Sequence, residues 1–445
     1  LQLLQPRGRR LALWILIAFA SPVLIYASIF WEHTLTTALC LGAAWLSFQI
    51  GPIGRAASFR QIIGWAIIGL ILAISAYIRS ETVFFALAWL LAYWLLIPRG
   101  RWGVVWAGIS LGVMLLLYVP LHRAMFGQTE KIFHSSFLSG FHPLSYLERA
   151  GWQVIPDLLI GAPEDGAIAG GWLSWIWAIA TIAAVGFSFV PNSRLAHNLM
   201  LLVLGLSALV GATFLFNPTP YRSAHGLLFT TPWIALGLCR AKEVWRRGDW
   251  RIQVIVLSTI LGLTSYLLAL IVIRAPHWGP HGALEWGMRY VMTFYPFLAI
   301  MAAWNLQAKW RDISSLVIIG ALVFLGVGFQ IRGLWTIRHD KQINARLNQI
   351  LAEAPGQYIV SDLWWLPLNA APIQPQKTVF FALPNRMADW VSLAAAAQAQ
   401  QFFLVTLNPS LLEEAGQRLG SSNLTPLEEY NVENLIIFHV ALEGR

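Results

Sequence analysis

Charged residues and cysteines are scarce in this chain of 445 residues. Only 11% of the residues are charged, whereas 57% are hydrophobic. The two cysteines, Cys40 and Cys239, both lie inside apolar runs, so neither a disulfide framework nor a cysteine metal site is supported. The sequence also has no GxxxxGK(S/T) motif, and no GxGxxG motif followed by a soluble βαβ unit. A site for a soluble nucleotide is therefore not predicted.

Apolar runs of membrane-spanning length recur from Leu11 to Ile331. They predict an α-helical polytopic membrane protein with about eleven spans, although the first two could form one kinked helical hairpin at Pro22. The expected spans are residues 11–28, 32–50, 61–78, 82–97, 103–120, 171–190, 198–216, 227–239, 252–273, 291–306 and 313–331. An ionisable residue at the end of such a span is costly to place and is a functional candidate by default.

The basic excess of the chain belongs to its membrane part. The net charge is +9, but residues 1–331 hold 22 Lys and Arg against 11 Asp and Glu, while residues 332–445 hold 8 against 10. We therefore expect no nucleic-acid partner. If the spans alternate, 15 basic residues fall in one class of loops and 7 in the other, longer class. The positive-inside rule then predicts the inner membrane, with the first class in the cytoplasm and Glu32 outside.

Residues 332–445 follow the last predicted span and are expected on the extracytoplasmic side. Helices are predicted at about 338–354, 386–400 and 410–419. Short apolar strands are predicted at residues 358–360, 378–381, 402–407 and 435–440. This alternation predicts a small α/β domain, so the chain divides into a membrane domain, residues 1–331, and an outer domain, residues 332–445.

Four outward positions repeat one pattern, a charged residue at a helix end beside aromatic residues. They are Trp31 to His33, Tyr77 to Thr82, Asn217 to His225 and His277 to Tyr290. The topology that places them on one side was derived from other loops, so their convergence favours a site on the outer face. The longest outward loop, residues 121–170, includes a segment, residues 143–160, with apolar residues at helical spacing, which predicts an interfacial helix or a lid on the bundle.

Glu32 and His33 are the candidate catalytic residues. Glu32 could accept a proton from an acceptor nucleophile or bind a divalent metal, and His33 could assist by hydrogen bonding or as a ligand. Alternatively, Glu32 only caps the helix that begins near His33, where a carboxylate interacts favourably with the helix dipole. A single Glu-His pair does not make a metal site, because catalytic metals need more protein ligands.

The candidate substrate-binding residues are Arg79, Glu81, Arg222, Glu285, Arg289 and Tyr290. Arg79 and Glu81 flank a turn, where they could contact substrate or form a structural salt bridge that pins the helix hairpin. Arg222 and Arg289 each adjoin a tyrosine at an outer helix end, which suits a bidentate grip on phosphate or contact with lipid headgroups. Glu285 could position a second substrate or pair with Arg289.

All of these candidate residues except Arg222 lie in blocks that resemble a known family. SPVLIYASIFWEHTLTTAL (residues 21–39), IRSET (78–82) and EWGMRYVMTFYPFLAI (285–300) are similar to stretches of C-type (GT-C) multi-spanning glycosyltransferases. The likeness is to the bacterial relatives of protein O-mannosyltransferases and aminoarabinose transferases. It covers residues 11–331 in topology, and a C-terminal outer domain of this kind is also appended in that superfamily.

The resemblance implies transfer of a sugar from a polyprenyl-phosphate donor to an acceptor, with inversion at the anomeric carbon, in the cell envelope. It implies that Glu32 lies near the donor phosphate or a divalent cation such as Mg²⁺ or Mn²⁺, and that Arg289 contacts phosphate. The family's main catalytic aspartate lies in the first outer loop, and no such loop precedes Leu11. The chain begins with Leu1, so we expect an N-terminally truncated and inactive fragment, or a degenerate member.

Two other functions remain open from the sequence. One is a transporter or flippase for an anionic lipid or small molecule, although transporters carry broken helices and internal repeats that are not evident here. The other is a non-catalytic membrane scaffold whose outer domain binds a partner. The identity of the sugar and the class of the acceptor, whether protein, lipid or polysaccharide, are not determined by the sequence.

Overall fold

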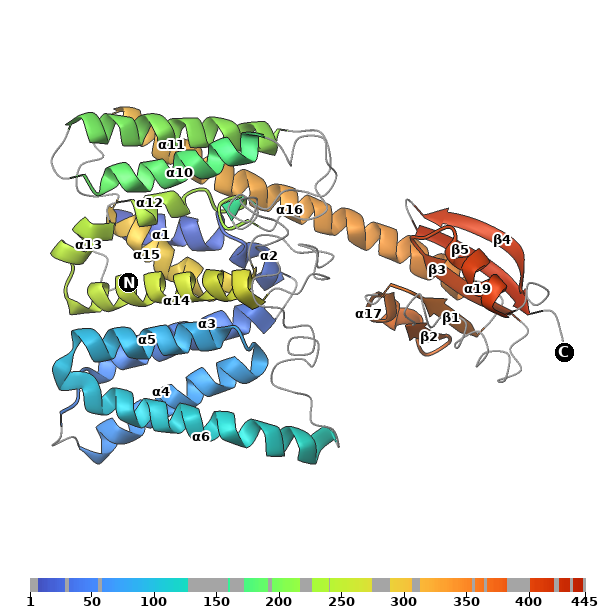
Figure 1. Cartoon of the computed structure of the whole chain (residues 1–445), viewed down its shortest axis with the longest axis horizontal. Coiled ribbons are helices and arrows are strands. Elements are labelled where there is room, and N and C mark those ends of the chain that lie inside the picture. The colour runs from blue at the N-terminus through green and yellow to red at the C-terminus, as the bar shows by residue number, and fades with distance from the viewer. Residues whose placement is uncertain are drawn as a thin grey trace. The chain divides into compact units, whose positions relative to one another are not determined.

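The structure is a computed structural model in which the chain forms two compact units, residues 1–334 (unit 1) and residues 335–445 (unit 2) (Figure 1). The boundary lies three residues from the one expected from the sequence. The structure describes residues 7–28, 32–54, 58–126, 159–160, 172–190, 194–216, 226–239, 241–273, 289–305, 313–353, 357–363, 366–381, 401–419, 424–432 and 435–442.

All the regular secondary structure in the described residues of unit 1 is helical. Its elements are α1 (Arg7–Ala18), α2 (Val23–Ser28), α3 (Glu32–Ile50), α4 (Phe59–Ile78), α5 (Thr82–Leu96), η1 (Pro98–Gly100), α6 (Arg101–Phe126), α10 (Trp172–Ser188), α11 (Arg194–Leu215), α12 (Ile234–Leu238), α13 (Ala241–Arg247), α14 (Trp250–Ile273), η3 (Arg289–Phe294), α15 (Tyr295–Asn305) and α16 (Ile313–Glu353).

Five described helices have the length and apolar composition of membrane spans. They are Phe59–Ile78, Pro98–Tyr118, Arg194–Leu215, Trp250–Ala269 and the first part of Ile313–Glu353. Three shorter apolar helices, Thr82–Leu96, Trp172–Ser188 and Val291–Trp304, lie beside them in the chain. These helices indicate a membrane-embedded protein, but the predicted number of about eleven spans is not confirmed.

Two of the predicted spans are wrong as continuous helices, and proline is the reason in both. The segment 227–239 is helical only over Ile234–Leu238, because Pro232 disfavours helical backbone at the residue before it. The segment 11–28 breaks near Pro22 into α1 and α2. Ser21 lies at this break, where its hydroxyl donates to the carbonyl of Ile17 (2.7 Å) and accepts from the backbone N–H of Val23 (3.3 Å).

The helices of unit 1 pack closely where glycine replaces a side chain. α4 packs along α6 and α3, α5 along α14, and α10 along α11. A Cβ atom added at Gly69 of α4 would lie 2.1 Å from the backbone oxygen of Ala107 in α6. Small residues allow helix backbones to approach in this way in a membrane, where van der Waals contact is the main attraction between helices.

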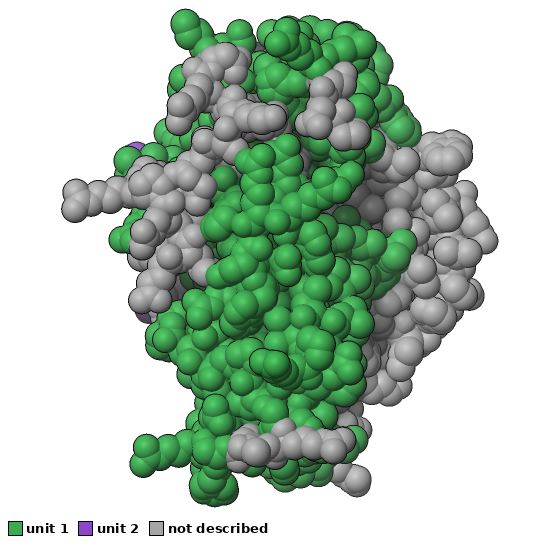
Figure 2. Space-filling view, turned by 90° about the vertical axis from the view of Figure 1, so that its left-hand side faces the viewer, with its two compact units in different colours: residues 1–334 green, residues 335–445 purple. Residues whose placement is uncertain are grey.

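The helices of this part of unit 1 run alternately between two ends. α3 and α5 run in one direction, and α4, α6 and α14 run in the other (Figure 1). The turn between α4 and α5 therefore lies at the same end as the start of α3. Figure 2 shows the opposite end of the unit, at which α5 ends and α14 begins.

α16 is a single helix of 41 residues that begins in unit 1 and ends in unit 2. The sequence predicts a span at 313–331 and a separate helix at about 338–354, and that separation is wrong. No proline lies between Ile331 and Glu353, and the segment is rich in residues that favour helix, such as arginine, leucine and glutamine. The change from apolar to polar composition marks the end of the span, not the end of the helix.

Unit 2 contains a five-stranded mixed sheet in the order β2-β1-β3-β5-β4. Its strands are β1 (Tyr358–Ser361), β2 (Thr378–Phe381), β3 (Gln401–Thr406), β4 (Leu424–Val432) and β5 (Leu435–Leu442). β1 pairs in parallel with β2 and β3, whereas β5 is antiparallel to both β3 and β4. The four predicted strands are confirmed. The sequence did not predict β4, because Pro426 and two adjacent glutamates interrupt the apolar pattern of a strand. A register shift between Pro426 and Glu428 accommodates the proline.

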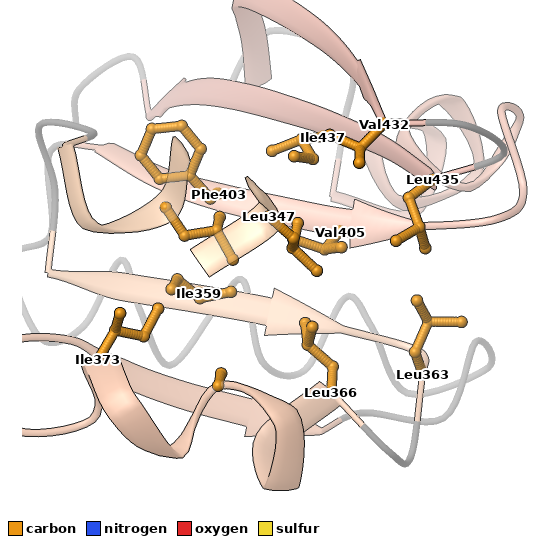
Figure 3. Packing of buried hydrophobic residues seen from close by; sticks show 12 residues of the cluster. Leu347, Ile359, Leu363, Leu366, Ile373, Phe403, Val405, Val432, Leu435 and Ile437 are labelled. Atoms are coloured by element: carbon orange, nitrogen blue, oxygen red, sulfur yellow. The ribbon is translucent and has the colours of Figure 1, made fainter. Parts of the chain in front are cut away.

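The sheet buries both of its faces. On one face Ile359, Phe403 and Ile437 pack with Leu347 of α16 and Leu366 of α17 (Leu366–Asn369) (Figure 3). On the other face Val360, Phe402, Leu404, Phe438 and Val440 pack with Leu411 of α19 (Leu411–Leu419). A short 3-10 helix, η4 (Ala371–Ile373), continues the first face. The helix predicted at 386–400 lies outside the described residues, and that predicted at 410–419 is confirmed as α19.

Replacing Gly69 by alanine is expected to destabilise unit 1, because the new methyl group meets the backbone of α6, which cannot move aside alone. Overpacking of this kind costs about 1–3 kcal/mol. Gly108→Ala in α6 is the matched control, since its Cβ meets nothing within 4 Å. Equilibrium unfolding of the detergent-solubilised chain by SDS measures both. Equal stability of the two variants would contradict the close α4–α6 contact.

Replacing Asp362 by asparagine is expected to stabilise unit 2 at neutral pH. Burial raises the pKa of the Asp362 carboxyl above its ordinary value, and a hydrogen bond from Thr406 only partly opposes this. The folded unit therefore holds this proton more tightly than the unfolded chain. That contribution to stability is fully present below the ordinary carboxyl pKa of about 4 and is lost as the pH rises through the folded pKa.

Hydrogen exchange of β1 and β3 amides in the intact chain, measured by mass spectrometry, tests this expectation. At pH 7 the Asp362→Asn variant should exchange several-fold more slowly than the original chain, and the difference should shrink as the pH approaches 4. Glu429→Gln, at an exposed position of β4, is the control. A constant difference across this pH range would show that ionisation of Asp362 is not the cause.

Candidate functional site

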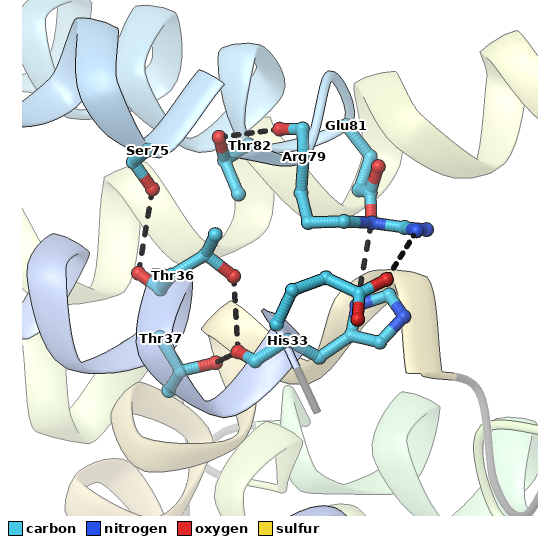
Figure 4. A network of polar contacts seen from close by, with 8 residues as sticks. His33, Thr36, Thr37, Ser75, Arg79, Glu81 and Thr82 are labelled. Carbon is cyan, nitrogen blue, oxygen red and sulfur yellow. Dashed lines mark hydrogen bonds and ion pairs between the residues drawn. The ribbon is translucent and has the colours of Figure 1, made fainter. Parts of the chain in front are cut away.

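Four of the residues predicted for the site come together at one end of unit 1. Glu32 and His33 begin α3, and Arg79 and Glu81 lie in the turn between α4 and α5. Figure 4 shows that the side chains of His33, Arg79 and Glu81 point toward one another, and an ion pair joins Arg79 to Glu32. The convergence of two of the four outer clusters is therefore present in the structure.

The local sequence explains both segments. α4 ends at Ile78, and Arg79 is extended, with φ −145° and ψ 110°. Its carbonyl then accepts from the hydroxyl of Thr82 (2.8 Å), in the first turn of α5. A turn of only three residues, Arg79 to Glu81, makes α4 and α5 an antiparallel pair. Glu32 lies in the first turn of α3, where a carboxylate interacts favourably with the helix dipole.

Arg79 bridges two carboxylates, one at the start of α3 and one in the turn between α4 and α5. Its Nη1 donates to Oε1 of Glu32 at 3.0 Å, and its Nε donates to Oε1 of Glu81 at 2.7 Å. Nδ1 of His33 lies 3.4 Å from the same oxygen of Glu81. The bridge between Arg79 and Glu81 fits the structural role that the sequence left open for this pair. Its extension to Glu32 links the turn to a helix 47 positions earlier in the chain.

Burial decreases across the cluster from His33 to Glu32. The side chains of His33 and Glu81 are 2% and 11% exposed, that of Arg79 is 21% exposed, and that of Glu32 is 34% exposed. The buried members are fixed by their neighbours: the His33 ring also meets the ring of Tyr26 edge-on, with centroids 5.7 Å apart. Glu32 is therefore the member that a molecule outside the bundle reaches most easily.

A second layer of polar contacts fixes the start of α3 on α4. The hydroxyls of Thr36 and Thr37 donate to the carbonyl of His33 at 3.0 and 2.8 Å. The hydroxyl of Ser75 donates to the carbonyl of Thr36 at 3.4 Å and lies 3.2 Å from the sulfur of Cys40 (Figure 4). These residues were not predicted from the sequence. Their signal, two threonines one turn after His33, is too common in helices to be specific.

The structure describes only some of the other predicted site residues. Arg289 and Tyr290 begin η3, and η3 packs against α3. Their segment therefore lies beside the helix that carries Glu32 and His33. Arg222 and Glu285 lie outside the described residues, as does most of the predicted interfacial helix at 143–160. The end of that segment, Leu159–Ile160, contacts the chain before α12, where the backbone N–H of Leu228 donates to the carbonyl of Leu159 at 2.7 Å.

The cluster does not fit a divalent cation. In the described parts of the chain, no three or more His, Cys, Asp or Glu side chains are grouped so that they could hold a metal ion. The position between the carboxylates of Glu32 and Glu81, where a cation would lie, is taken by the guanidinium of Arg79. The metal-binding role predicted for Glu32 therefore has no support in this geometry.

The arrangement is suited to proton transfer at an exposed carboxylate. Arg79 holds Glu32 in place, while Glu81 and His33 hold Arg79 from the buried side. A carboxylate that is fixed in this way can accept a hydrogen bond, and then a proton, from a hydroxyl group that approaches the end of the bundle.

Comparison of the chain with protein-family models, curated proteins and solved structures found no match.

Removing the guanidinium of Arg79 is expected to destabilise unit 1, because it leaves the carboxylates of Glu32 and Glu81 facing each other without a cation. Breaking a buried pair costs about 3–5 kcal/mol, and the exposure of Glu32 reduces this to about 2 kcal/mol for Arg79→Gln. Arg79→Lys should cost less, since it keeps the charge but not the fork of donors. SDS unfolding of the solubilised chain measures these changes.

A double-mutant cycle distinguishes this coupling from a simple loss of packing. Glu81→Gln in the Arg79→Gln background should restore part of the lost stability, because it removes the more buried of the two unpaired carboxylates. If the effects of the two substitutions were additive, Arg79 and Glu81 would not be coupled as described.

Proposed function

We propose that unit 1 transfers a sugar from a polyprenyl-phosphate donor to the hydroxyl group of an acceptor, as an inverting hexosyltransferase of the GT-C type. The observation that supports this most strongly is the cluster of Glu32, His33, Arg79 and Glu81 at one end of a membrane-embedded helical bundle. A donor anchored in the bilayer reaches such a site by lateral diffusion. The absence of a nucleotide-binding motif in the sequence favours the same class of donor.

In this proposal Glu32 is the general base, so the chain is expected to be active, unlike the inactive fragment that the family resemblance implied. The acceptor hydroxyl oxygen forms a bond to the anomeric carbon, and its proton passes to the carboxylate of Glu32. The bond between the anomeric carbon and the phosphate oxygen breaks, and polyprenyl phosphate leaves with the electron pair. Arg79, Glu81 and His33 act as positioning residues, because they hold Glu32 and do not touch the reacting atoms.

The leaving phosphate needs a cation near the anomeric carbon. We assign this role to Arg289, with Arg222 as a second contact, since an arginine fork matches the geometry of phosphate oxygens. The position of Arg289 at the start of η3, which packs on α3, supports this assignment. By the positive-inside rule, the site and unit 2 are on the extracytoplasmic side of the inner membrane.

The substitution Glu32→Gln is expected to lower the rate of transfer by about 100-fold or more, because an amide cannot accept the proton. Membranes that contain the protein are incubated with polyprenyl phosphate linked to radiolabelled glucose, mannose or galactose, together with a membrane extract as the source of acceptors. The release of polyprenyl phosphate is measured. The original chain should consume at least one of the three donors.

Glu243→Gln in α13 is the control for loss of a carboxylate elsewhere in unit 1, and it should leave the rate unchanged. Retained transfer in the Glu32→Gln variant would remove Glu32 from the mechanism. Failure of the original chain to consume any of the three donors would argue against the proposed activity.

A further inference from the structure

The end of unit 1 opposite the candidate site carries an excess of basic residues. At this end α5 ends, η1 and α6 follow it, and α13 leads into α14 (Figure 1, Figure 2). Two segments supply the charges, residues 99–101 and residues 242–251. We call the surface that they form the basic surface, and its basic members are Arg99, Arg101, Lys242, Arg246, Arg247 and Arg251.

Both segments adjoin helices that have the composition of membrane spans. Arg101 begins α6, and Arg251 is the second residue of α14; the first of these helices contains the candidate span Pro98–Tyr118 and the second contains Trp250–Ala269. One helical turn advances by about 5 Å, so both charges lie within a turn of the end of a span. This is the depth of the lipid headgroups when the helices cross a bilayer.

The ring of Tyr93 joins the two segments. Tyr93 of α5 meets the ring of Trp250 edge-on, with the ring centroids 5.7 Å apart. A Cβ atom added at Gly100 would lie 2.6 Å from the same tyrosine ring, so the segment that holds Arg99 and Arg101 packs against it as well. The two basic segments, which are distant in the sequence, therefore lie on either side of one side chain and form a single surface.

α13 carries its basic residues on the side away from the bundle. Ala241 and Val244 are buried, and α13 packs against α14 and α15. Lys242, Arg246 and Arg247 are exposed. These three charges are therefore accessible to a ligand outside the bundle.

The charges of the basic surface are not neutralised by the protein. The two segments hold six basic residues and two carboxylates, Glu243 and Asp249, which leaves a net charge of +4 (6 − 2). Asp249 caps α14 instead, because its Oδ1 accepts from the backbone N–H groups of Arg251 and Ile252, both at 3.1 Å. In the part of the chain that the structure describes, none of the six basic side chains forms an ion pair, whereas Arg79 at the other end holds two carboxylates.

Tryptophan side chains accompany these charges. Trp94 and Trp102 are 38% and 43% exposed. The guanidinium of Arg101 lies 5.3 Å from the centroid of the Trp94 ring, and that of Arg251 lies 5.4 Å from the centroid of the Trp250 ring. Tryptophan is enriched at the level of lipid headgroups, because its ring is apolar and its N–H is polar. The rings therefore hold the two guanidinium groups at this level.

This combination of charge, exposure and depth selects one class of ligand. Groups of about four to eight Lys and Arg directly beside a membrane span attract anionic lipids, and an arginine fork matches the geometry of phosphate oxygens. We propose that the basic surface binds the headgroups of anionic phospholipids, of which phosphatidylglycerol is the simplest probe. The positive-inside rule concerns only how many basic residues lie on one side of the membrane, whereas this proposal assigns lipid binding to one defined surface.

The proposal does not depend on sugar transfer in unit 1. The whole chain is purified in detergent, and native mass spectrometry measures its binding of phosphatidylglycerol and of phosphatidylcholine with the same acyl chains. The first molecule of phosphatidylglycerol should bind about tenfold more tightly than the first molecule of phosphatidylcholine, because only phosphatidylglycerol carries a net negative charge. This preference should decrease as the salt concentration rises, since exposed charges are screened.

The double variant Arg246→Gln with Arg247→Gln should reduce the preference for phosphatidylglycerol by about fivefold or more, because it removes two of the exposed charges. The matched control is Lys341→Gln with Arg346→Gln, which removes two exposed charges from α16 at positions ten or more residues beyond Ile331. It should keep the preference of the original chain. SDS unfolding should give equal stability for both variants, since none of the four side chains forms an ion pair among the described residues.

The double variant Arg246→Lys with Arg247→Lys keeps both charges and should retain most of the preference. Equal binding of the two lipids by the original chain would overturn the proposal, as would an unchanged preference in the Arg246→Gln and Arg247→Gln variant. A loss of the same size in the α16 control would show that the net charge of the chain governs binding, and would contradict the assignment to the basic surface.

Discussion

The candidate site depends on the ion pairs that the guanidinium of Arg79 makes. It holds one carboxylate from the start of α3 and one from the turn before α5, so two segments that are distant in the sequence share a single cation. Near a membrane, charges separated from water need partners of opposite sign, and this need fixes the geometry of the whole cluster. The outermost carboxylate, Glu32, is thereby presented at the end of the bundle in a defined orientation.

The two units are stabilised by different interactions, and these interactions determine where a functional site can form in each unit. In unit 1 the helices approach through small residues such as Gly69, and the hydroxyls of Thr36 and Thr37 are hydrogen-bonded to a backbone carbonyl. Charged residues are thereby left for the helix ends, where the candidate site lies. In unit 2 the central strands of the sheet are covered on both faces by apolar side chains.

Much of this architecture was predictable from periodicity and composition. The apolar runs gave the positions of the long helices, and the short apolar segments after Gln357 gave four of the five strands. The errors have local physical causes. Pro232 limits the predicted span at 227–239 to a short helix. The charged residues after Ile331 were interpreted as the end of a helix, but α16 continues through them. Pro426 interrupts the strand pattern of β4, an edge strand in which a register shift accommodates the proline.

The sequence by itself determined that long apolar helices recur before residue 331, that an α/β unit follows, and that Glu32, His33, Arg79 and Glu81 lie at helix ends. These features depend on local composition and on the cost of placing charge in a bilayer. Only the tertiary structure decided that Arg79 joins Glu32 to Glu81, and that Asp362 faces Thr406 across two parallel strands. Such pairs depend on helix packing and strand register, because they bring together residues about 40 or more positions apart, beyond the reach of local sequence patterns.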